Sequence, residues 1–166
     1  MKGLGLMSIL ILYGSEYGAT EKCVQLIMKH LRGKVDAINL NQTKPGNIDN
    51  YDIILIGGGI YAGKLQSNIV KFVEANEECL RSKKVGMFIC CKEGEKAVEY
   101  VKANIPNRLV NDLFMLEHTG YEINLERMNR LEKFLIKSIF KIKESYSQLN
   151  YDAINRIGNK INEMDR

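Results

Sequence analysis

Runs of apolar residues alternate along the chain with segments in which apolar residues recur at helical spacing. Runs of strand length are Met7–Tyr13, Val35–Leu40, Asp52–Ile56, Lys84–Cys90 and Leu113–His118. Helical spacing marks Thr20–Leu31, a segment from about Ser67, Glu95–Asn104 and Asn150–Met164. A continuous apolar run is typical of a parallel strand that is covered on both faces. The alternation therefore predicts an α/β fold in which right-handed crossovers place helices on both faces of a parallel sheet.

Composition and charge narrow the class of protein. The chain has 166 residues, of which 45% are hydrophobic and 27% charged, with two prolines and no repeat, so we expect one domain over residues 1–166. The net charge of +4 is mild, and basic residues are interleaved with acidic ones, which argues against nucleic acid as the main partner. The four cysteines show no metal-ligand spacing and no signal peptide precedes them, so we expect no metal site and a cytoplasmic location. Met1–Leu6 is expected to be an extension before the first strand.

The turn after the first strand contains the main candidate for binding chemistry. Gly14 and Gly18 flank hydroxyl-bearing residues, and a helix follows. Ligands of open α/β sheets bind at the carboxyl ends of the strands, where backbone N–H groups and a helix N-terminus suit a phosphate. A Walker loop needs a lysine that this turn lacks, so hydrolysis of a nucleoside triphosphate is not expected. The alternative is an ordinary strand-to-helix turn capped by a threonine.

The same turn resembles the phosphate loop of the flavodoxin superfamily. The matching residues are Ser15, Glu16, Tyr17, Gly18, Ala19 and Thr20, followed by the acidic Glu21. The match departs at Tyr17, where a small threonine is commoner. The resemblance implies a flavodoxin-like three-layer sandwich with strand order 2-1-3-4-5, and FMN as the cofactor, held by uncharged donors.

Two further segments resemble the flavin loops of that superfamily. The first comprises Gly59, Ile60, Tyr61, Ala62 and Gly63, where Tyr61 is the candidate to cover the flavin ring. The second comprises Cys91, Lys92, Glu93 and Gly94, whose backbone donors would meet the pyrimidine edge of the ring. GGGIYAG also fits a loose dinucleotide fingerprint, but the next strand ends in cysteines instead of the acidic residue that binds a ribose, which disfavours this alternative.

Other chemistry-bearing residues are expected to be structural. Cys90 and Cys91 are adjacent, yet no base that would activate a thiol is evident, so packing is favoured over redox chemistry. His30 and His118 stand alone and are expected to be structural or solvent-facing, and no hydrolase motif is present. We therefore assign no catalytic side chain, because the chemistry would belong to the flavin.

The segment Leu125–Lys143 is predicted to be an amphipathic helix. It places Leu125, Met128, Leu131, Leu135, Ile139 and Ile142 on one stripe, with basic residues opposite and Phe134, Ile136 and Phe140 on the flanks. This helix either packs on the domain or contacts an anionic membrane surface or a partner protein. The segment His118–Ile142 and the helix after it resemble the quinone-dependent protoporphyrinogen dehydrogenases, a flavodoxin-fold family, and the similarity extends over most of the chain from Met7.

The resemblance implies an FMN-binding oxidoreductase that passes electrons from a reduced donor, porphyrinogen being the candidate, to a quinone or another acceptor. Such a protein is expected in the cytoplasm, with peripheral contact at the inner membrane surface as an option. The rival is an electron carrier without its own substrate, but such carriers are typically acidic, and the sequence pI here is about 8.8. A third hypothesis is an interaction domain that has lost the flavin.

Overall fold

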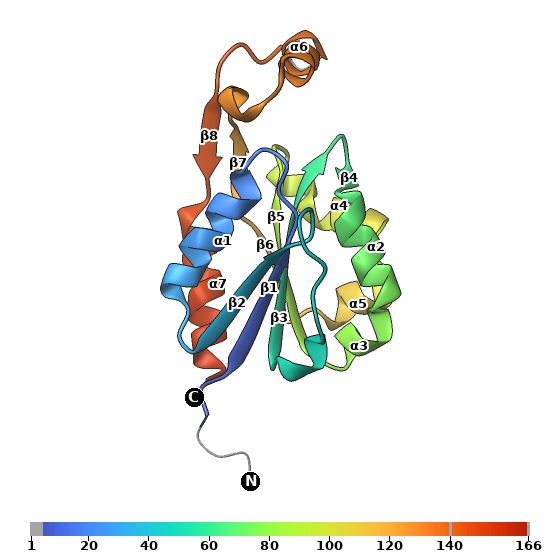
Figure 1. Ribbon diagram of the computed structural model, residues 1–166, viewed down its shortest axis with the longest axis vertical. Coiled ribbons are helices and arrows are strands. Elements are labelled where there is room, and N and C mark those ends of the chain that lie inside the picture. Colours follow the sequence, from blue (N-terminus) through green and yellow to red (C-terminus); the bar gives the residue numbers. More distant parts are fainter. Residues whose placement is uncertain (1–4, 140, 166) are drawn as a thin grey trace.

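The centre of the molecule is a twisted parallel sheet (Figure 1). Its strands are β1 (Ser8–Tyr13), β2 (Lys34–Asn39), β3 (Ile53–Tyr61), β5 (Lys84–Cys90) and β6 (Met115–His118). They pair in the order β2-β1-β3-β5-β6, and each pair along this path is parallel. This confirms the predicted flavodoxin-like order 2-1-3-4-5.

The structure is a computed structural model that describes residues 5–139 and 141–165. Most of the expected extension Met1–Leu6 lies outside the described residues, and so does Phe140 of the predicted amphipathic segment.

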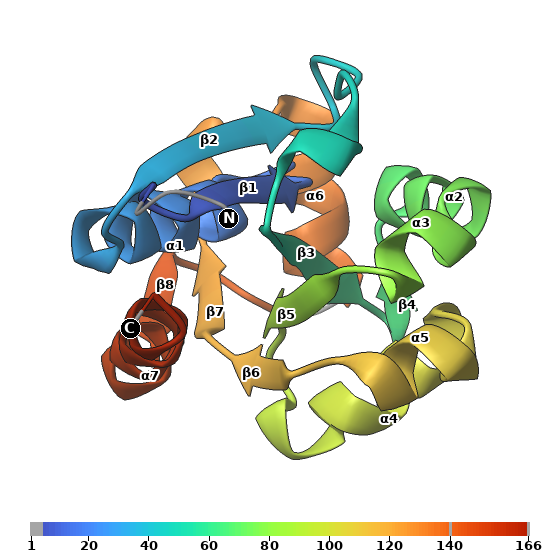
Figure 2. The same ribbon diagram turned by 90° about the horizontal axis from the view of Figure 1, so that it is seen from below.

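Helices cover both faces of the sheet and complete three layers (Figure 2). They are α1 (Ala19–His30) and α7 (Tyr151–Glu163) on one face, and α2 (Ser67–Ala75), α3 (Glu77–Arg81), α4 (Ala97–Asn104) and α5 (Asn107–Asp112) on the other. Ile9 and Ile11 of β1 pack towards α1 and α7, whereas Leu10 and Leu12 pack towards the opposite layer. All four are fully buried, which explains why β1 is apolar at successive positions.

Strand β3 continues through the glycines that the sequence suggested would follow it. The predicted strand ended at Ile56, but the observed one runs to Tyr61, and Gly57, Gly58 and Gly59 pair with β5. A Cβ atom at Gly57 would overlap the ring of the fully buried Phe88. The glycine therefore makes room for a large side chain of the neighbouring strand, which is a packing role and not that of a loop.

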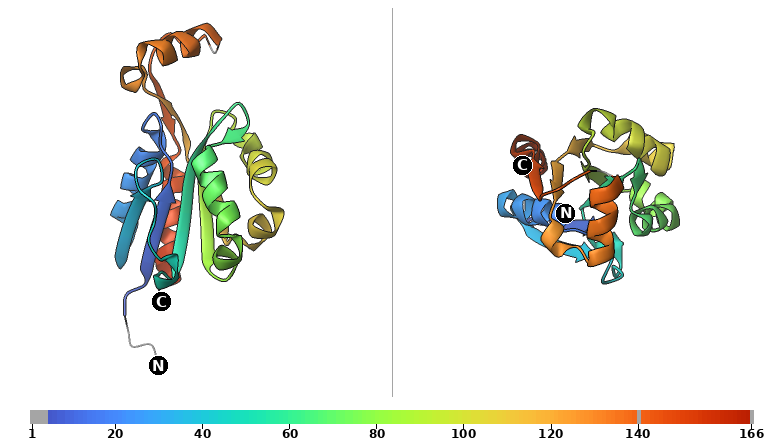
Figure 3. Two further views of the ribbon diagram at one scale, coloured as in Figure 1. Left: turned by 45° about the vertical axis from the view of Figure 1, so that its right-hand side comes forward. Right: turned by 90° about the horizontal axis from the view of Figure 1, so that it is seen from above.

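A two-stranded arm leaves the body after β6. Strands β7 (Gly120–Ile123) and β8 (Tyr146–Leu149) pair antiparallel and lead to helix α6 (Arg130–Ile139), which lies beyond the end of the sheet (Figures 1 and 3). Side chains from both the arm and the body form a small apolar cluster at its base. Its buried members are Ile123, Leu125 and Met128, and its partly buried ones are Tyr17, Tyr121, Ile136 and Ile142.

The predicted helix over Leu125–Lys143 is therefore wrong in its extent. Its first part is a 3₁₀ helix, Leu125–Arg127, whose N-terminus is capped by Asn124. Helix α6 has its own start, because the Asn129 side chain accepts from the Glu132 amide at 2.9 Å and Glu132 accepts from the Asn129 amide at 2.8 Å. This capping box separates Leu125 and Met128, which are in the core, from the exposed apolar residues of α6.

Other element boundaries shift by small amounts. The helix expected over Glu95–Asn104 begins as a 3₁₀ turn, Gly94–Lys96, before α4, and the last parallel strand begins at Met115 instead of Leu113. The sequence patterns missed the short helices α3 and α5 and the strand β4 (Lys64–Leu65), which pairs antiparallel with β3. The predicted cap of α7 is confirmed: the Asn150 side chain accepts from the Ala153 amide at 3.0 Å. Within the described ranges, no helix is both long and apolar enough to cross a membrane.

We expect the substitution Gly57→Ala to destabilise the fold by about 1–3 kcal/mol, the usual cost of overpacking a core, because the added methyl group overlaps the Phe88 ring. Gly46→Ala is the matched control, since no heavy atom lies within 4 Å of a Cβ atom there. The measurement is the urea midpoint of unfolding for each variant. Equal midpoints for the two variants would contradict the packing role given to Gly57.

Candidate functional site

The turn between β1 and α1 is organised around the hydroxyl of Ser15. This oxygen accepts hydrogen bonds from the amides of Gly18, at 3.2 Å, and Glu21, at 3.4 Å. Gly18 has a φ of +92°, a left-handed conformation that favours glycine, and it directs the chain into α1. The first amides of any helix lack intrahelical acceptors, so this turn gathers N–H donors at the positive end of α1.

Two of the predicted phosphate-loop residues face the core. Ala19 and Thr20 are buried, and the Thr20 hydroxyl interacts with the thiol of Cys90. The side chain of Thr20 is thus turned away from the turn, and its contribution there comes from its backbone. On the outer side, the Asn41 side chain donates from Nδ2 to the Ser15 carbonyl at 3.0 Å and fixes the start of the turn.

A cation reaches this turn from the arm. The Arg127 guanidinium lies against Gly18, where a Cβ atom would overlap it, and its Nη1 is 3.8 Å from the carboxylate of Glu21. Local sequence could not reveal this arrangement, because Arg127 follows the turn by more than a hundred residues. We expected uncharged donors alone at this turn, and the structure adds one guanidinium beside them.

Tyr17 joins the turn to the second predicted loop. Its ring meets that of Tyr61 edge to face, with centroids 5.7 Å apart and an interplanar angle of 89°. Burial raises the pKa of both phenols, so both remain neutral at physiological pH. The unusual residue at position 17 is thus an aromatic partner for the candidate ring-covering residue.

The second loop is a tight hairpin between β3 and β4. Ala62 and Gly63 both have positive φ, 50° and 74°, as a type I′ turn requires. The Asn104 side chain holds this hairpin: it donates to the Gly63 carbonyl at 2.9 Å and accepts from the Leu65 amide at 3.1 Å. Gly59, Ile60 and Tyr61, which we expected in the loop, belong to β3.

Gln66 links the hairpin to the phosphate-type turn. Its Oε1 accepts from the Gly59 amide at 3.2 Å. The same oxygen lies beside Gly14, where an added Cβ atom would be only 2.8 Å from it. The sequence patterns singled out neither Gln66 nor Asn104, because a polar side chain beside a turn has no periodic signature.

The third loop is fixed from both sides at Cys91. The Cys91 amide donates to the Gly120 carbonyl at 3.0 Å, and its own carbonyl is 2.7 Å from Nε2 of His118. Gly94 packs closely on the His118 ring. A Cβ atom added at Gly94 would lie only 2.5 Å from that ring. The expectation that His118 is structural is in accord with this contact, and its specific role is to hold the third loop.

Glu93 is tied to α4. It accepts from the Tyr100 hydroxyl and forms an ion pair with Lys96 at 2.9 Å, and these hydrogen bonds lower its pKa. The third loop is thus connected to the body on one side and to α4 on the other.

The second and third loops enclose a cavity of about 280 Å³. Its walls come from both loops, from α4 and from the arm. They are formed by Ile60, Tyr61, Ala62, Gly63, Cys91, Lys92, Glu93, Tyr100, Tyr121, Ile136 and Ile142. Gly59, Gly94 and residues 15–20 do not line it, and the Tyr17–Tyr61 contact connects that turn to the cavity wall. A second cavity of about 410 Å³ shares Lys92, Tyr121 and Ile142 with the first and extends beneath the arm.

The cysteines contribute packing in this part of the molecule. The Cys23 and Cys90 sulfur atoms lie 3.7 Å apart in the core, and the hydrogen bond between them raises the pKa of Cys23. Burial raises the pKa of Cys91 to about 11, so its thiol stays protonated at neutral pH and is a poor nucleophile.

Several solved structures resemble the architecture of this chain. A short-chain flavodoxin associated with a PDU-type bacterial microcompartment matches with a TM-score of 0.62 at 12% identity, over 97% of this chain and 100% of that one. A flavodoxin of Streptococcus pneumonia TIGR4 gives 0.59 at 14% identity, over 95% of this chain and 99% of that one. The flavodiiron protein of Giardia intestinalis gives 0.58 at 10% identity, and there 95% of this chain matches 37% of the longer protein. These likenesses show the fold.

Comparisons of sequence define the family. An uncharacterized protein of Methanocaldococcus jannaschii is 41% identical over 69 residues, which are 41% of this chain and 45% of that protein. This chain thus matches less than half the length of that relative. The family model described as "Flavodoxin domain" matches residues 10–150, which is most of the chain. The sheet order, the turn after β1 and this match together establish that the chain belongs to the flavodoxin domain family.

Proposed function

We propose that this protein binds FMN and is a flavin-dependent oxidoreductase. The proposal rests on the contact between two different kinds of binding surface. A set of N–H donors at the positive end of α1 is joined, through the Tyr17–Tyr61 contact, to an apolar cavity with aromatic walls. A phosphate on a short chain attached to a flat ring is the type of ligand that such a pair would bind.

The donor set suits the phosphate of FMN. Ser15 holds the turn in a shape that leaves amides of the first turn of α1 available, and helix N-termini attract anions. Arg127 adds a full positive charge beside Gly18, and its ion pair with Glu21 is long and partly exposed. An incoming phosphate would offer the guanidinium a closer anion than that carboxylate.

The cavity suits the flavin ring. Tyr61, Tyr100 and Tyr121 provide aromatic surface, and Ile60, Ile136 and Ile142 provide apolar surface. The Cys91 amide, expected as a donor to the ring, already donates to the Gly120 carbonyl. The polar groups of the third loop that could meet the ring are therefore those of Lys92 and Glu93, which line the cavity. When bound, FMN would supply the electron exchange, while these residues bind the ring, orient it and exclude water from it.

A reduced porphyrinogen is our candidate donor, and a quinone our candidate acceptor. The resemblance of residues 118–142 to the protoporphyrinogen dehydrogenases supports this choice, as does the second cavity beside the first. That cavity has an apolar wall at Ile142 and aromatic rings at Tyr121 and Tyr146, and its charged residues are of both signs: Lys92, Lys143 and Glu144. Such a lining suits a flat apolar molecule with polar substituents.

The alternative function is that of an electron carrier. The match to two flavodoxins over at least 95% of the chain favours it. Electron carriers exchange electrons through a flavin ring edge that is open to a partner protein. Here Ile136 and Ile142 of the arm line the candidate ring cavity and would cover part of the ring. The arm therefore favours a bound substrate.

The substitution Arg127→Gln tests the phosphate site. We expect FMN affinity to fall by roughly tenfold or more, because a hydrogen bond from a charged group contributes about 1.5–3 kcal/mol. Riboflavin, which lacks the phosphate, should bind equally well to both proteins. The measurement is quenching of flavin fluorescence during titration with each ligand.

Arg130→Gln is the matched control, since this exposed arginine is also on the arm. It should leave both affinities within about twofold. Equal losses for FMN and riboflavin in Arg127→Gln would show that the residue acts through the fold, and no loss for either would remove Arg127 from the site. Absence of saturable quenching in the native protein would overturn the FMN proposal itself.

The proposed substrate is tested with FMN-loaded protein, protoporphyrinogen and menadione. We expect porphyrin fluorescence to grow above the uncatalysed background, and Ile142→Asp to lower kcat/KM at least tenfold, because a charge in the wall shared by both cavities disfavours an apolar ligand. Val98→Asp, at an exposed apolar position on α4, is the control and should retain activity. FMN saturation without any porphyrin formation would favour the carrier instead.

A further inference from the structure

Helix α6 presents an apolar face that the body of the protein leaves open. Leu131, Phe134 and Ile139 are each about two-thirds exposed, at 67%, 66% and 66%, and Leu135 is 43% exposed. They recur at helical spacing and form one stripe, which we call the outer face of α6. Half of the exposed large hydrophobic residues in the described ranges lie on this ten-residue helix. Such a concentration marks an interaction surface.

Another side of the same helix is engaged with the body. Ile136 packs in the cluster at the base of the arm and lines the 280 Å³ cavity. None of the four outer-face residues lines that cavity or the larger one beside it. Among the described residues, the outer face therefore contributes to neither of these cavities.

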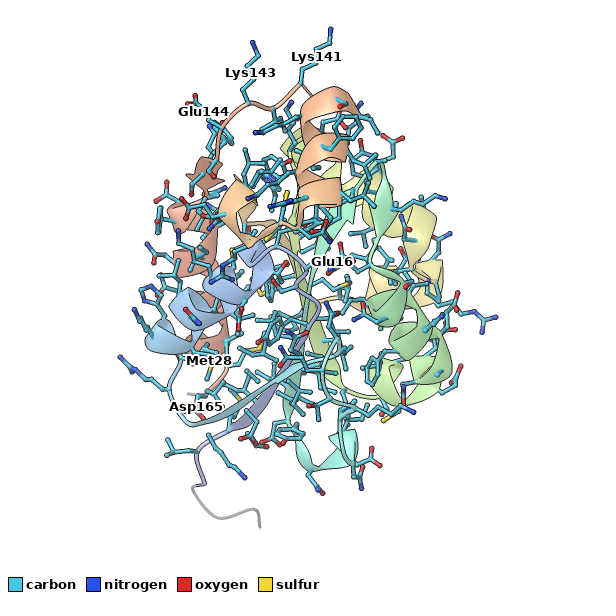
Figure 4. All side chains as sticks on the ribbon, turned by 45° about the horizontal axis from the view of Figure 1, so that its top comes forward. Glu16, Met28, Lys141, Lys143, Glu144 and Asp165 are labelled. Carbon is cyan, nitrogen blue, oxygen red and sulfur yellow. The ribbon has the colours of Figure 1, made fainter. Side chains whose placement is uncertain are left out.

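Positive charge gathers at this end of the arm. Residues 130–143 contain five basic side chains and one carboxylate, so this short segment carries a formal charge of +4, equal to that of the whole chain. The one carboxylate, Glu132, is occupied in the capping box at the start of α6. Lys141 and Lys143 project away from the body at the far end of the arm (Figure 4). The remainder of the protein is neutral overall, so a negatively charged surface would be attracted to this end.

We propose that the outer face of α6 docks on an anionic membrane surface. An apolar stripe with a lysine-rich polar face opposite is the pattern of helices that lie in the lipid headgroup region, with apolar side chains below and cations attracted to anionic lipids. A bilayer requires no shape complementarity, which agrees with a face that lines neither cavity. A ten-residue helix in water is only marginally stable by itself, so burial of this face in lipid also stabilises α6.

Docking would set the candidate flavin site at the membrane. Ile136 of α6 forms part of the cavity wall, and the outer face is presented by the same helix. The docking surface and the cavity wall thus share one short helix. The docking itself does not depend on FMN, because none of the outer-face residues lines the cavity.

A tryptophan probe tests this proposal directly, since the chain contains no tryptophan. In Phe134→Trp, emission should shift to shorter wavelength when vesicles of phosphatidylglycerol and phosphatidylcholine are added, and should remain unchanged with phosphatidylcholine alone. Val98→Trp, which places the probe at an exposed position on α4, should show no shift with either. A missing shift in Phe134→Trp, or an equal shift in both variants, would overturn the proposal.

The charge requirement is tested by cosedimentation with the same vesicles. Replacing Lys133, Lys137 and Lys141 by glutamine should lower the partition coefficient by about 100-fold, since each cation near an anionic surface contributes about a factor of five. The control replaces the exposed Lys29, Lys71 and Lys102 of other helices, which gives the same net charge, and should change binding by less than about threefold. Equal losses in the two triple variants would overturn the assignment to α6.

Two further measurements keep the alternatives apart. Sedimentation equilibrium without lipid should give a monomer; a dimer that Phe134→Ser dissociates would assign the outer face to a second copy and overturn membrane docking. FMN titration of each variant reports separately on the flavin site. Vesicle binding by protein that fails to bind FMN would leave the docking intact and remove only the proposed function.

Discussion

Parallel pairing of β3 with both β1 and β5 is the interaction on which the site depends. Tyr13 pairs with Gly57, and Gly59 pairs with Cys90, so the carboxyl ends of three strands reach one edge of the sheet. The turn after β1, the hairpin after β3 and the loop after β5 therefore meet in space. Gly57 permits this close pairing, because it leaves the volume that the Phe88 ring fills. A larger residue there would force apart the strands that bring the three loops together.

The parts of the structure that could be predicted from sequence are those that local patterns determine. Apolar runs predicted the parallel strands, and the order of the strands followed from the resemblance to flavodoxins. Asn150 marked the start of α7, because an N-cap acts within one turn of the helix. The hydroxyl and glycine pattern located the donor turn. The resemblance to flavin loops pointed to the segments that form the cavity, since Tyr61 and Cys91 both line it.

The parts that were missed depend on contacts between distant residues. Arg127 reaches Gly18, and Lys22 forms an ion pair with Glu122 at 3.0 Å, although each pair is separated by about a hundred residues. No periodicity encodes such contacts. The extent of α6 was missed for a different reason: Leu125 and Met128 continue the apolar stripe in sequence, but the capping box at Asn129 restarts the helix and sends the two halves of the stripe to different surroundings.

The arm makes the two halves of the candidate site depend on each other. An ion pair between Lys22 of α1 and Glu122 holds the arm on the body. Burial opposes ionisation of Glu122, but hydrogen bonds from Ser147 and Lys22 outweigh it, so the pKa of Glu122 is lowered. From this position the arm brings Arg127 to the donor turn and Ile136 and Ile142 to the cavity. Displacement of the arm would therefore remove a charge from one end of the site and an apolar wall from the other. A ligand that contacts both ends would gain from a closed arm twice, and its binding would hold the arm on the body by the same free energy.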